Sequence, residues 1–223
     1  MKIRIRNDDV LFRSKGWSDP ATRFRQIDDW MAVSDRVIHV PAILVNEIQD
    51  FPDTIALIRE ETAKGRMMPE IHGLAHIDYA KVGLPREKIV NPRKVDYSIF
   101  SPEEIQAHVD EVRAHLRFCK DWITDKFGRA PRIWYTPWGA NEPTLQQACR
   151  EEGLLFVGTD RTIPIKEGCR KLREGHMQLE QLDGCEFFTH WWDRGLAVWR
   201  MSLAMAAGSW EEAHRRNPDV FNG

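Results

Sequence analysis

Residues 2–9 of the chain read KIRIRNDD, and the fold can first be predicted from this stretch. Charged and apolar residues alternate with a period of two over its first half, which predicts a strand from Lys2 to Arg6. Two adjacent carboxylates, Asp8 and Asp9, follow at the carboxyl end of that strand. Paired aspartates are also common in turns, so a functional site here needs support from other parts of the chain.

Downstream of this stretch, short apolar segments alternate with longer amphipathic ones. The expected strands are 37–45, 67–71, 132–136, 154–157 and 186–189, and the expected helices are 20–34, 51–64, 102–126 and 142–152. The segment 196–207 fits either a helix or a strand. Strands that alternate with helices predict parallel βα units, and hence a single α/β domain built as a barrel or as a doubly wound sheet.

Two local patterns lie in the middle of the chain. Ser101, followed by Pro102 and Glu104, is typical of a helix start with a capping box. The polar segment 79–100 is long for a plain connection, and segments of this length often bind ligands or act as lids.

Composition excludes several classes of protein. The chain has 223 residues, of which 42% are hydrophobic and 30% charged, so it can bury a substantial core. Its formal net charge of −2 provides no basic field for nucleic acid, and its apolar runs are well short of the roughly 20 residues that span a bilayer. With no apolar leader before the first strand and four widely spaced cysteines, we expect a cytoplasmic chain with reduced thiols.

The residues suited to chemistry follow the expected strands. His72 and His76 are four residues apart, a spacing that lets two imidazoles share a metal ion. In α/β folds the carboxyl ends of the strands meet at one edge, so these histidines and the aspartate pair are expected to lie together. Two histidines and one carboxylate leave coordination positions open for water and substrate, and a second carboxylate can act as a general base.

Taken in order, these motifs resemble the polysaccharide deacetylase (NodB-like, carbohydrate esterase family 4-like) superfamily over nearly the whole chain. The matching segments are Asp8-Asp9, His72 with His76, Pro137-Trp138-Gly139, and the strand-end His190. The resemblance implies a distorted (β/α)7-type barrel, with residues 1–223 forming one catalytic domain.

The resemblance also implies a mechanism, the removal of acetyl groups from an N-acetylated sugar or polysaccharide precursor. Asp9, His72 and His76 would hold one divalent metal, expected to be zinc, with cobalt, nickel, manganese and iron as alternatives. Asp8 would be the catalytic base and His190 the general acid. The substrate and the oxyanion would be contacted by a further group of residues, namely Trp138 with its amide, Tyr135, Pro137, Asn141 and Trp191.

The sequence departs from the family pattern at two positions near the site. Tyr135 stands where the family has an arginine that orients the base, and Gly73 stands where serine or threonine is usual. A cation from the segment 79–100 is expected to close over the site with substrate and restore the missing charge, the candidates being Arg86, Lys88, Arg93 and Lys94. The fourth motif is only partly matched, at Asp160.

Two other functions remain open from the sequence. The chain has nine tryptophans, and Trp134, Trp138, Trp191 and Trp192 lie near the motifs, where aromatic faces suit sugar rings. A catalytically impaired glycan-binding module is therefore one alternative. A hydrolase of a non-sugar amide on the same fold is the other. No nucleic acid and no membrane span is expected, and the oligomeric state is left open.

Overall fold

The structure, a computed structural model, describes residues 3–11, 22, 24–25, 37–91, 94–157, 163–164, 186–190 and 215. The strands are β1 (Ile3–Val10), β2 (Val37–Leu44), β3 (Glu70–Gly73), β4 (Ile133–Tyr135), β5 (Leu155–Val157), β6 (Ile163–Pro164) and β7 (Glu186–His190). The α-helices are α2 (Val45–Ile48), α3 (Pro52–Ala63), α4 (Pro102–Phe127) and α5 (Pro143–Glu151). Four short 3-10 helices complete this part of the chain: η2 (Tyr79–Lys81), η3 (Arg86–Lys88), η4 (Tyr97–Ile99) and η5 (Pro137–Gly139).

The seven strands form one parallel sheet in the order β5-β4-β3-β2-β1-β7-β6. The first strand therefore lies beside the last, and β2 to β5 follow on its other side in chain order. This is the order of a barrel that is open between β5 and β6. A doubly wound sheet would instead reverse its strand order near the middle. The topology thus selects the barrel-type arrangement from the two that the sequence allowed.

Contacts across the inner face show that the sheet is strongly curved. Val40 and Ala42 of β2 pack with Ile133 and Tyr135 of β4 in one buried cluster. The guanidinium carbon of Arg6, on β1, lies 4.3 Å from the centroid of the Tyr135 ring. In a flat sheet β1 and β4 would be about 14 Å apart, because three strand spacings separate them. The sheet therefore curls around a small interior that contains these side chains.

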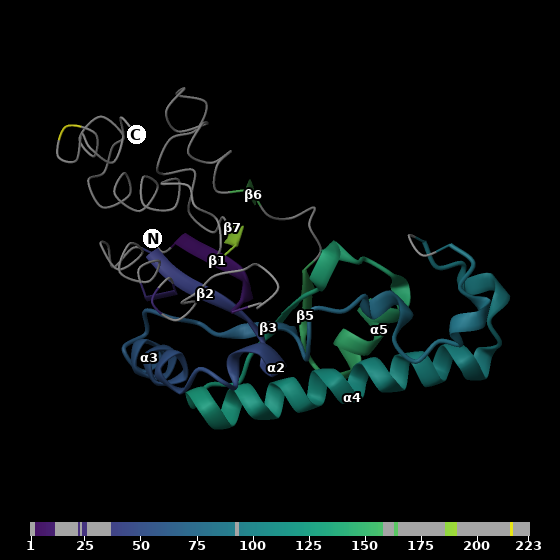
Figure 1. The fold of residues 1–223 in the computed structure, drawn as a ribbon, viewed down its shortest axis with the longest axis horizontal. Helices are drawn as coiled ribbons and strands as arrows, with labels where there is room; N and C mark the ends of the chain where they lie inside the picture. Colours follow the sequence, from purple (N-terminus) through teal and green to yellow (C-terminus); the bar gives the residue numbers. More distant parts are fainter. Residues whose placement is uncertain are drawn as a thin grey trace.

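The main hydrophobic core lies on the other face of the sheet, under the helices. The long helix α4 runs beside the strands (Figure 1) and contributes buried residues at helical spacing: Val109, Val112, Leu116, Cys119, Ile123 and Phe127. The predicted capping box is confirmed, because Ser101 and Glu104 each accept a hydrogen bond from the other's backbone N–H. The helix ends at Gly128, which has a positive φ of 70°.

Most predicted elements are present, with shifted boundaries. The strand expected at 67–71 is observed as β3 (Glu70–Gly73), and Met67 makes only an isolated bridge to His39. Pro69 explains the shift, because it has no N–H to continue the ladder. The two-residue strand β6 was not predicted, and it is too short to leave a periodic pattern.

The segment 79–100 is a packed loop with its own small core. Four of its side chains form a buried cluster, made of Ala80, Leu84, Val95 and Phe100. His108 of α4 ties the loop to the domain by donating from Nδ1 to the carbonyl of Val82, and its Nε2 lies 3.0 Å from Thr144 Oγ1. The loop is therefore held against α4 and α5.

Other expectations fall partly or wholly outside the described residues. Of the helix expected at 20–34, Thr22, Phe24 and Arg25 are described and helical. The segment 196–207 and Asp160 lie outside. Cys119 and Cys149 are buried free thiols, as expected for reduced cysteines. Within the ranges given above, none of the helices has the length and apolar character that crossing a membrane requires.

Candidate metal centre

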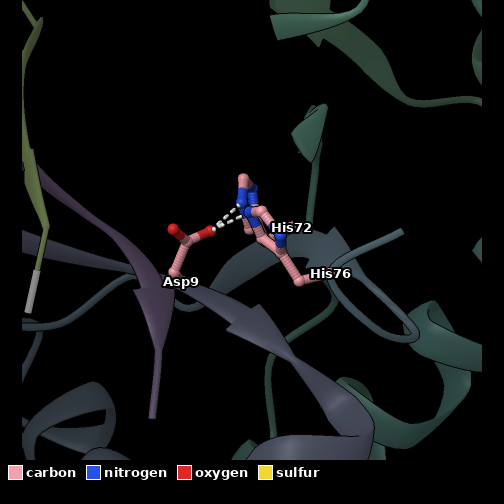
Figure 2. Close-up of side chains that lie close together, drawn as sticks. All are labelled: Asp9, His72 and His76. Atoms are coloured by element: carbon pink, nitrogen blue, oxygen red, sulfur yellow. Dashed lines mark hydrogen bonds and ion pairs between the residues drawn. The ribbon is translucent and has the colours of Figure 1, made fainter. Parts of the chain in front are cut away.

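Three side chains from two strand ends meet at one point of the sheet edge. The Nε2 atoms of His72 and His76 lie 2.5 Å and 3.0 Å from the same carboxylate oxygen of Asp9. Figure 2 shows the carboxylate of Asp9 facing both imidazoles. One potential ligand atom from each of the three residues lies within 4.8 Å of the other two. The structure thus brings together the trio that the sequence singled out.

Both strands that contribute to this trio, β1 and β3, have one extra residue relative to their neighbour β2. Between Asn7 and Val10, β1 advances three residues while β2 advances only two, from Pro41 to Ile43. This bulge coincides with a φ of 54° at Asp9, in a region that non-glycine residues rarely adopt. A similar irregularity on β3 lies at His72, between the paired residues Ile71 and Gly73. Bulges of this kind commonly redirect side chains beside functional sites.

The hydrogen bonds of His72 suit it to bind a metal. Its Nδ1–H donates to the carbonyl oxygen of Tyr135 at 2.7 Å, and its Nε2 lies 2.5 Å from Oδ1 of Asp9. At this distance the nitrogen and the carboxylate oxygen need either a proton or a cation between them. Metal-bound histidines typically donate their second N–H in this way. The donor set of two imidazoles and one carboxylate therefore fits a divalent metal such as zinc.

Electrostatics at Asp9 agree with a site for positive charge. Burial raises the pKa of this carboxyl, but hydrogen bonds from His72 and His76, together with their charges, outweigh it. The net result is a pKa held well below its ordinary value. Asp9 is only 4% exposed, so the carboxylate stays charged in a buried place where it needs cationic partners.

The second aspartate is held by an arginine from the same strand. Arg6 Nε lies 2.7 Å from Asp8 Oδ1, and Arg6 Nη2 donates to Asp8 Oδ2 at 2.9 Å. The sequence predicts a cation from the segment 79–100 that closes with substrate, and the structure places Arg6 of β1 beside Asp8. One signal in the sequence could have identified Arg6, because it lies two residues before Asp8 and hence on the same face of the strand.

The four loop cations named earlier lie in different surroundings. Lys88 pairs with Glu104 of α4 at 2.6 Å. Arg86 lines a pocket of about 450 Å³ together with Lys81 and Ile77, the residue that follows His76. Lys94 is exposed, and Arg93 lies outside the described residues.

Tyr135 supports two other site residues. Its ring lies under the guanidinium of Arg6, and its carbonyl oxygen accepts the hydrogen bond from His72. The family resemblance predicts that Tyr135 contacts the substrate. At 1% exposure it has almost no surface to offer a substrate, so it contributes to the site by supporting Arg6 and His72.

The turn after β4 presents one large aromatic side chain to solvent. Trp138 is 73% exposed, has a φ of 61°, and its ring centroid lies 4.7 Å from that of His76. Pro137 is buried beneath this turn, and Asn141 is exposed and accepts a hydrogen bond from Gln146. Trp134, by contrast, is fully buried in the outer core and donates to the carbonyl of His72, so it cannot stack on a sugar.

Gly73 is explained by its neighbour in the packed loop. A Cβ at this position would lie 2.8 Å from Tyr79 Oη and 2.9 Å from Tyr79 Cε2. Tyr79 is fully buried, and its hydroxyl accepts a hydrogen bond from the N–H of Leu74 at 2.7 Å. The space that a serine or threonine would need is therefore filled by a tyrosine that fixes the turn between the two histidines.

The last predicted site residues come from β7. In the parallel pairing of β1 with β7, His190 is in register with Asp8. The backbone of His190 thus lies directly beside the strand position of Asp8. Trp191 lies outside the described residues.

The chain was compared with known proteins by sequence and by structure. No protein-family model matches it, and no curated protein matches it in sequence. Solved structures do match. The peptidoglycan deacetylase PdaC from Bacillus subtilis has a TM-score of 0.54 and 12% identity, and the match covers 99% of this chain and 96% of that one.

Two further solved structures match over the full length of this chain. A family 4 acetyl xylan esterase from Clostridium thermocellum, solved with a cobalt ion, has a TM-score of 0.54 at 15% identity, covering 100% of this chain and 91% of the other. A family 4 pseudoenzyme from Bacillus anthracis has a TM-score of 0.51 at 10% identity, covering 100% of this chain and 60% of the other. At such low identities these matches establish the fold alone. The chain has the NodB-like (β/α)7 fold of the family 4 polysaccharide deacetylases.

Proposed function

We propose that this chain is a metal-dependent deacetylase that removes the acetyl group from an N-acetylated sugar or a polysaccharide precursor. The single observation that carries the proposal is the meeting of Asp9, His72 and His76, with Asp8 held beside them. Matches to deacetylases of the same fold support it. Residues 1–223 would form one catalytic domain.

Asp9, His72 and His76 would hold the metal, for which zinc is the best fit because it favours imidazole and carboxylate ligands. A divalent metal at this position supplies Lewis acidity, which polarises a carbonyl and makes a water molecule easier to deprotonate. His72 is oriented for this role by its hydrogen bond to the Tyr135 carbonyl.

Asp8 would accept the proton of the attacking water. Asp8 is 7% exposed, its Oδ2 accepts a hydrogen bond from Arg6 Nη2, and its Oδ1 lies 2.7 Å from Arg6 Nε, so it would act from a restrained orientation rather than as a mobile surface group. His190 would protonate the leaving nitrogen, and its register beside Asp8 supports this assignment.

Trp138 would bind the sugar. Its exposed ring beside His76 offers an apolar face on which the C–H face of a pyranose can pack. Its amide, at the turn with positive φ, is proposed to donate to the oxyanion that forms on the acetyl carbonyl. Pro137 would shape this turn, and Asn141 and Trp191 would contact more distant parts of the substrate.

One alternative has a specific observation in its favour. The large exposed ring of Trp138 would serve a glycan-binding module equally well, and the fold includes a described pseudoenzyme. Such a module would bind sugars without releasing acetate. A third possibility, hydrolysis of a non-sugar amide, would use the same metal and base with a different substrate.

The test measures metal content first and chemistry second. The purified protein would be loaded with zinc or cobalt, and acetate release would be followed from N-acetylglucosamine oligomers, an O-acetylated xylan and a non-sugar N-acetyl amide. Metal binding at one ion per chain with acetate released from the N-acetyl sugars supports the proposal. Sugar binding without release would favour the binding module, and failure to bind metal would reject the deacetylase.

A further inference from the structure

We propose that Arg6, seated on the ring of Tyr135, is the positioning residue that holds Asp8 in its working orientation. The inference rests on the proposed function, in which Asp8 is the base. It identifies an element that neither the fold comparison nor the sequence motifs assign, namely a pair of residues from β1 and β4 that act through Asp8.

The contact between Arg6 and Asp8 combines one hydrogen bond with a second close approach of opposite charges. Arg6 Nη2 donates to Asp8 Oδ2 at 2.9 Å, and Arg6 Nε lies 2.7 Å from Asp8 Oδ1 without hydrogen-bond geometry, while both side chains are less than 10% exposed. A planar guanidinium close to both oxygens opposes rotation about the last carbon–carbon bond as well as a change of distance. A lysine, which is a point charge on a flexible stem, would fix distance only.

Tyr135 keeps the arginine in place. The guanidinium carbon lies 4.3 Å above the tyrosine ring, within the range of a cation–π contact, and the ring is itself buried among apolar side chains of β2 and β4. The arginine is therefore clamped between an aromatic face and a carboxylate. This explains how a long, flexible side chain can serve as a fixed support.

The same tyrosine also supports the metal site. Its carbonyl oxygen accepts the hydrogen bond that orients His72, while its ring supports the arginine that orients Asp8. The base and a metal ligand thus share one anchor on β4. A shift of this residue would move both supports, so the position of the base is coupled to that of the metal ligand.

Strand geometry explains why the arginine can come from β1. Residues two apart on a strand point to the same face, so Arg6 and Asp8 both project into the interior of the curved sheet. There they meet the inner-face residue Tyr135, which projects from β4. A tyrosine at position 135 is therefore suited to the site because it provides the platform that an arginine on β1 requires.

The experiment compares Arg6→Lys with Arg4→Lys, the same substitution two residues earlier on the same strand. Arg6→Lys keeps the charge and should fold, so the loss of the planar guanidinium beside both oxygens can be measured by itself. We expect turnover to fall about 100-fold, as for a misplaced catalytic group, with KM and the metal-induced rise in Tm unchanged. Arg4→Lys should leave turnover within about twofold of wild type.

A relocation variant provides the rescue. In Arg6→Ala combined with Tyr135→Arg, the guanidinium returns to Asp8 from β4, and turnover should exceed that of Arg6→Ala alone by about 10-fold. A folded Arg6→Lys protein with wild-type turnover would overturn the inference, as would a folded double variant with no gain over Arg6→Ala.

The inference and the proposed function can fail separately. A wild-type protein that binds metal and releases no acetate contradicts the proposed function alone. In that case the seating of Arg6 on Tyr135 is measured by a double-mutant cycle of thermal unfolding with Arg6→Gln, which removes the cation, and Tyr135→Leu, which removes the ring. Additive effects in that cycle would overturn the inference, and a clear coupling between the two residues would support it.

Discussion

Thermal unfolding with and without metal tests the centre of the site, and Asp9→Asn is the most informative variant. The substitution keeps the size of the side chain and one oxygen donor, and removes the charge that faces both imidazoles. In the wild type, three donors from β1, β3 and the turn after β3 already converge. Little reorganisation is therefore needed for metal binding, and most of the binding free energy should appear as stabilisation of the folded chain.

The expected size of the effect follows from mass action. At a free metal concentration of about 100 times Kd, a site present only in the folded state adds about 2.7 kcal/mol of stability. For a chain of 223 residues each kcal/mol raises Tm by about 2–4 °C, which predicts an increase of about 5–11 °C. Asp9→Asn should reduce this increase to below about 2 °C at the same concentration, because the only charged ligand is lost.

The pH dependence of the same measurement has a definite sign. Burial raises the pKa of Asp9, yet its bonds to the two histidines lower it more, so the folded-state pKa lies below the unfolded one. In the metal-free protein Asp9 therefore contributes stability above about pH 4, and this contribution is lost as the pH falls through the folded-state pKa.

The assay is calorimetry or dye-monitored unfolding of metal-free protein titrated with zinc and with cobalt. Asp121→Asn is a matched control, since it is the same substitution at an exposed aspartate on α4. It should show the full metal-induced increase. An equal increase in Asp9→Asn and wild type would refute the reasoning, because the ion would then bind elsewhere on the chain.

Three further predictions concern neighbouring residues. Asp8→Asn should lower acetate release by about 10²–10⁴-fold while the metal-induced rise in Tm persists. His72→Ala should lose both the activity and the rise in Tm. Equal loss of metal binding in the two variants would show that the roles of the adjacent aspartates are assigned the wrong way round. Trp138→Ala should raise KM for sugar substrates about fivefold, as expected for a stacking contact of about 1 kcal/mol, and should leave Tm nearly unchanged because the ring is 73% exposed. Gly73→Ser should cost about 1–3 kcal/mol in urea unfolding, because its Cβ would overlap Tyr79, and the cost should shrink in a Tyr79→Ala background.

Much of the fold was predictable because its signals are local. The capping box at Ser101 and the helical spacing of apolar residues on α4 are both present as predicted. The start of β3 was placed wrongly because hydrophobic periodicity carries no information about a missing N–H. Pro69 cannot donate a backbone hydrogen bond, so the strand begins only after it. The choice between a barrel and a doubly wound sheet depended on which strands are neighbours, a property that no single segment encodes.

The candidate site was also predictable only in part, where its signals are local in the sequence. The trio of potential metal ligands could be inferred because adjacent aspartates and two histidines four residues apart are recognisable in sequence and follow expected strands. Arg6 was missed because an arginine in an alternating strand is normally interpreted as solvent-facing, and only the curvature of the sheet turns this face inward. Position 135 appeared to lack a cation for the same reason, since the cation comes from a strand three places away in the sheet.

The adjacent aspartates show how the backbone itself builds this site. In a regular strand Asp8 and Asp9 would point to opposite faces, and one carboxylate would be buried in the outer core without a partner. The bulge between Asn7 and Val10, with its φ of 54° at Asp9, removes that conflict. Such a conformation costs on the order of 1–3 kcal/mol at a non-glycine residue.

The cost is tolerated because the residues that follow are firmly held. Val10 and Leu11 are fully buried in the outer core, so the chain must return to that face immediately after Asp9. The matching irregularity at His72 on β3 lets the imidazole meet the carboxylate while Ile71 remains in the same core. Glycine at position 9 would relieve the strain and lose the ligand, which is why a strained aspartate is the residue that this geometry requires.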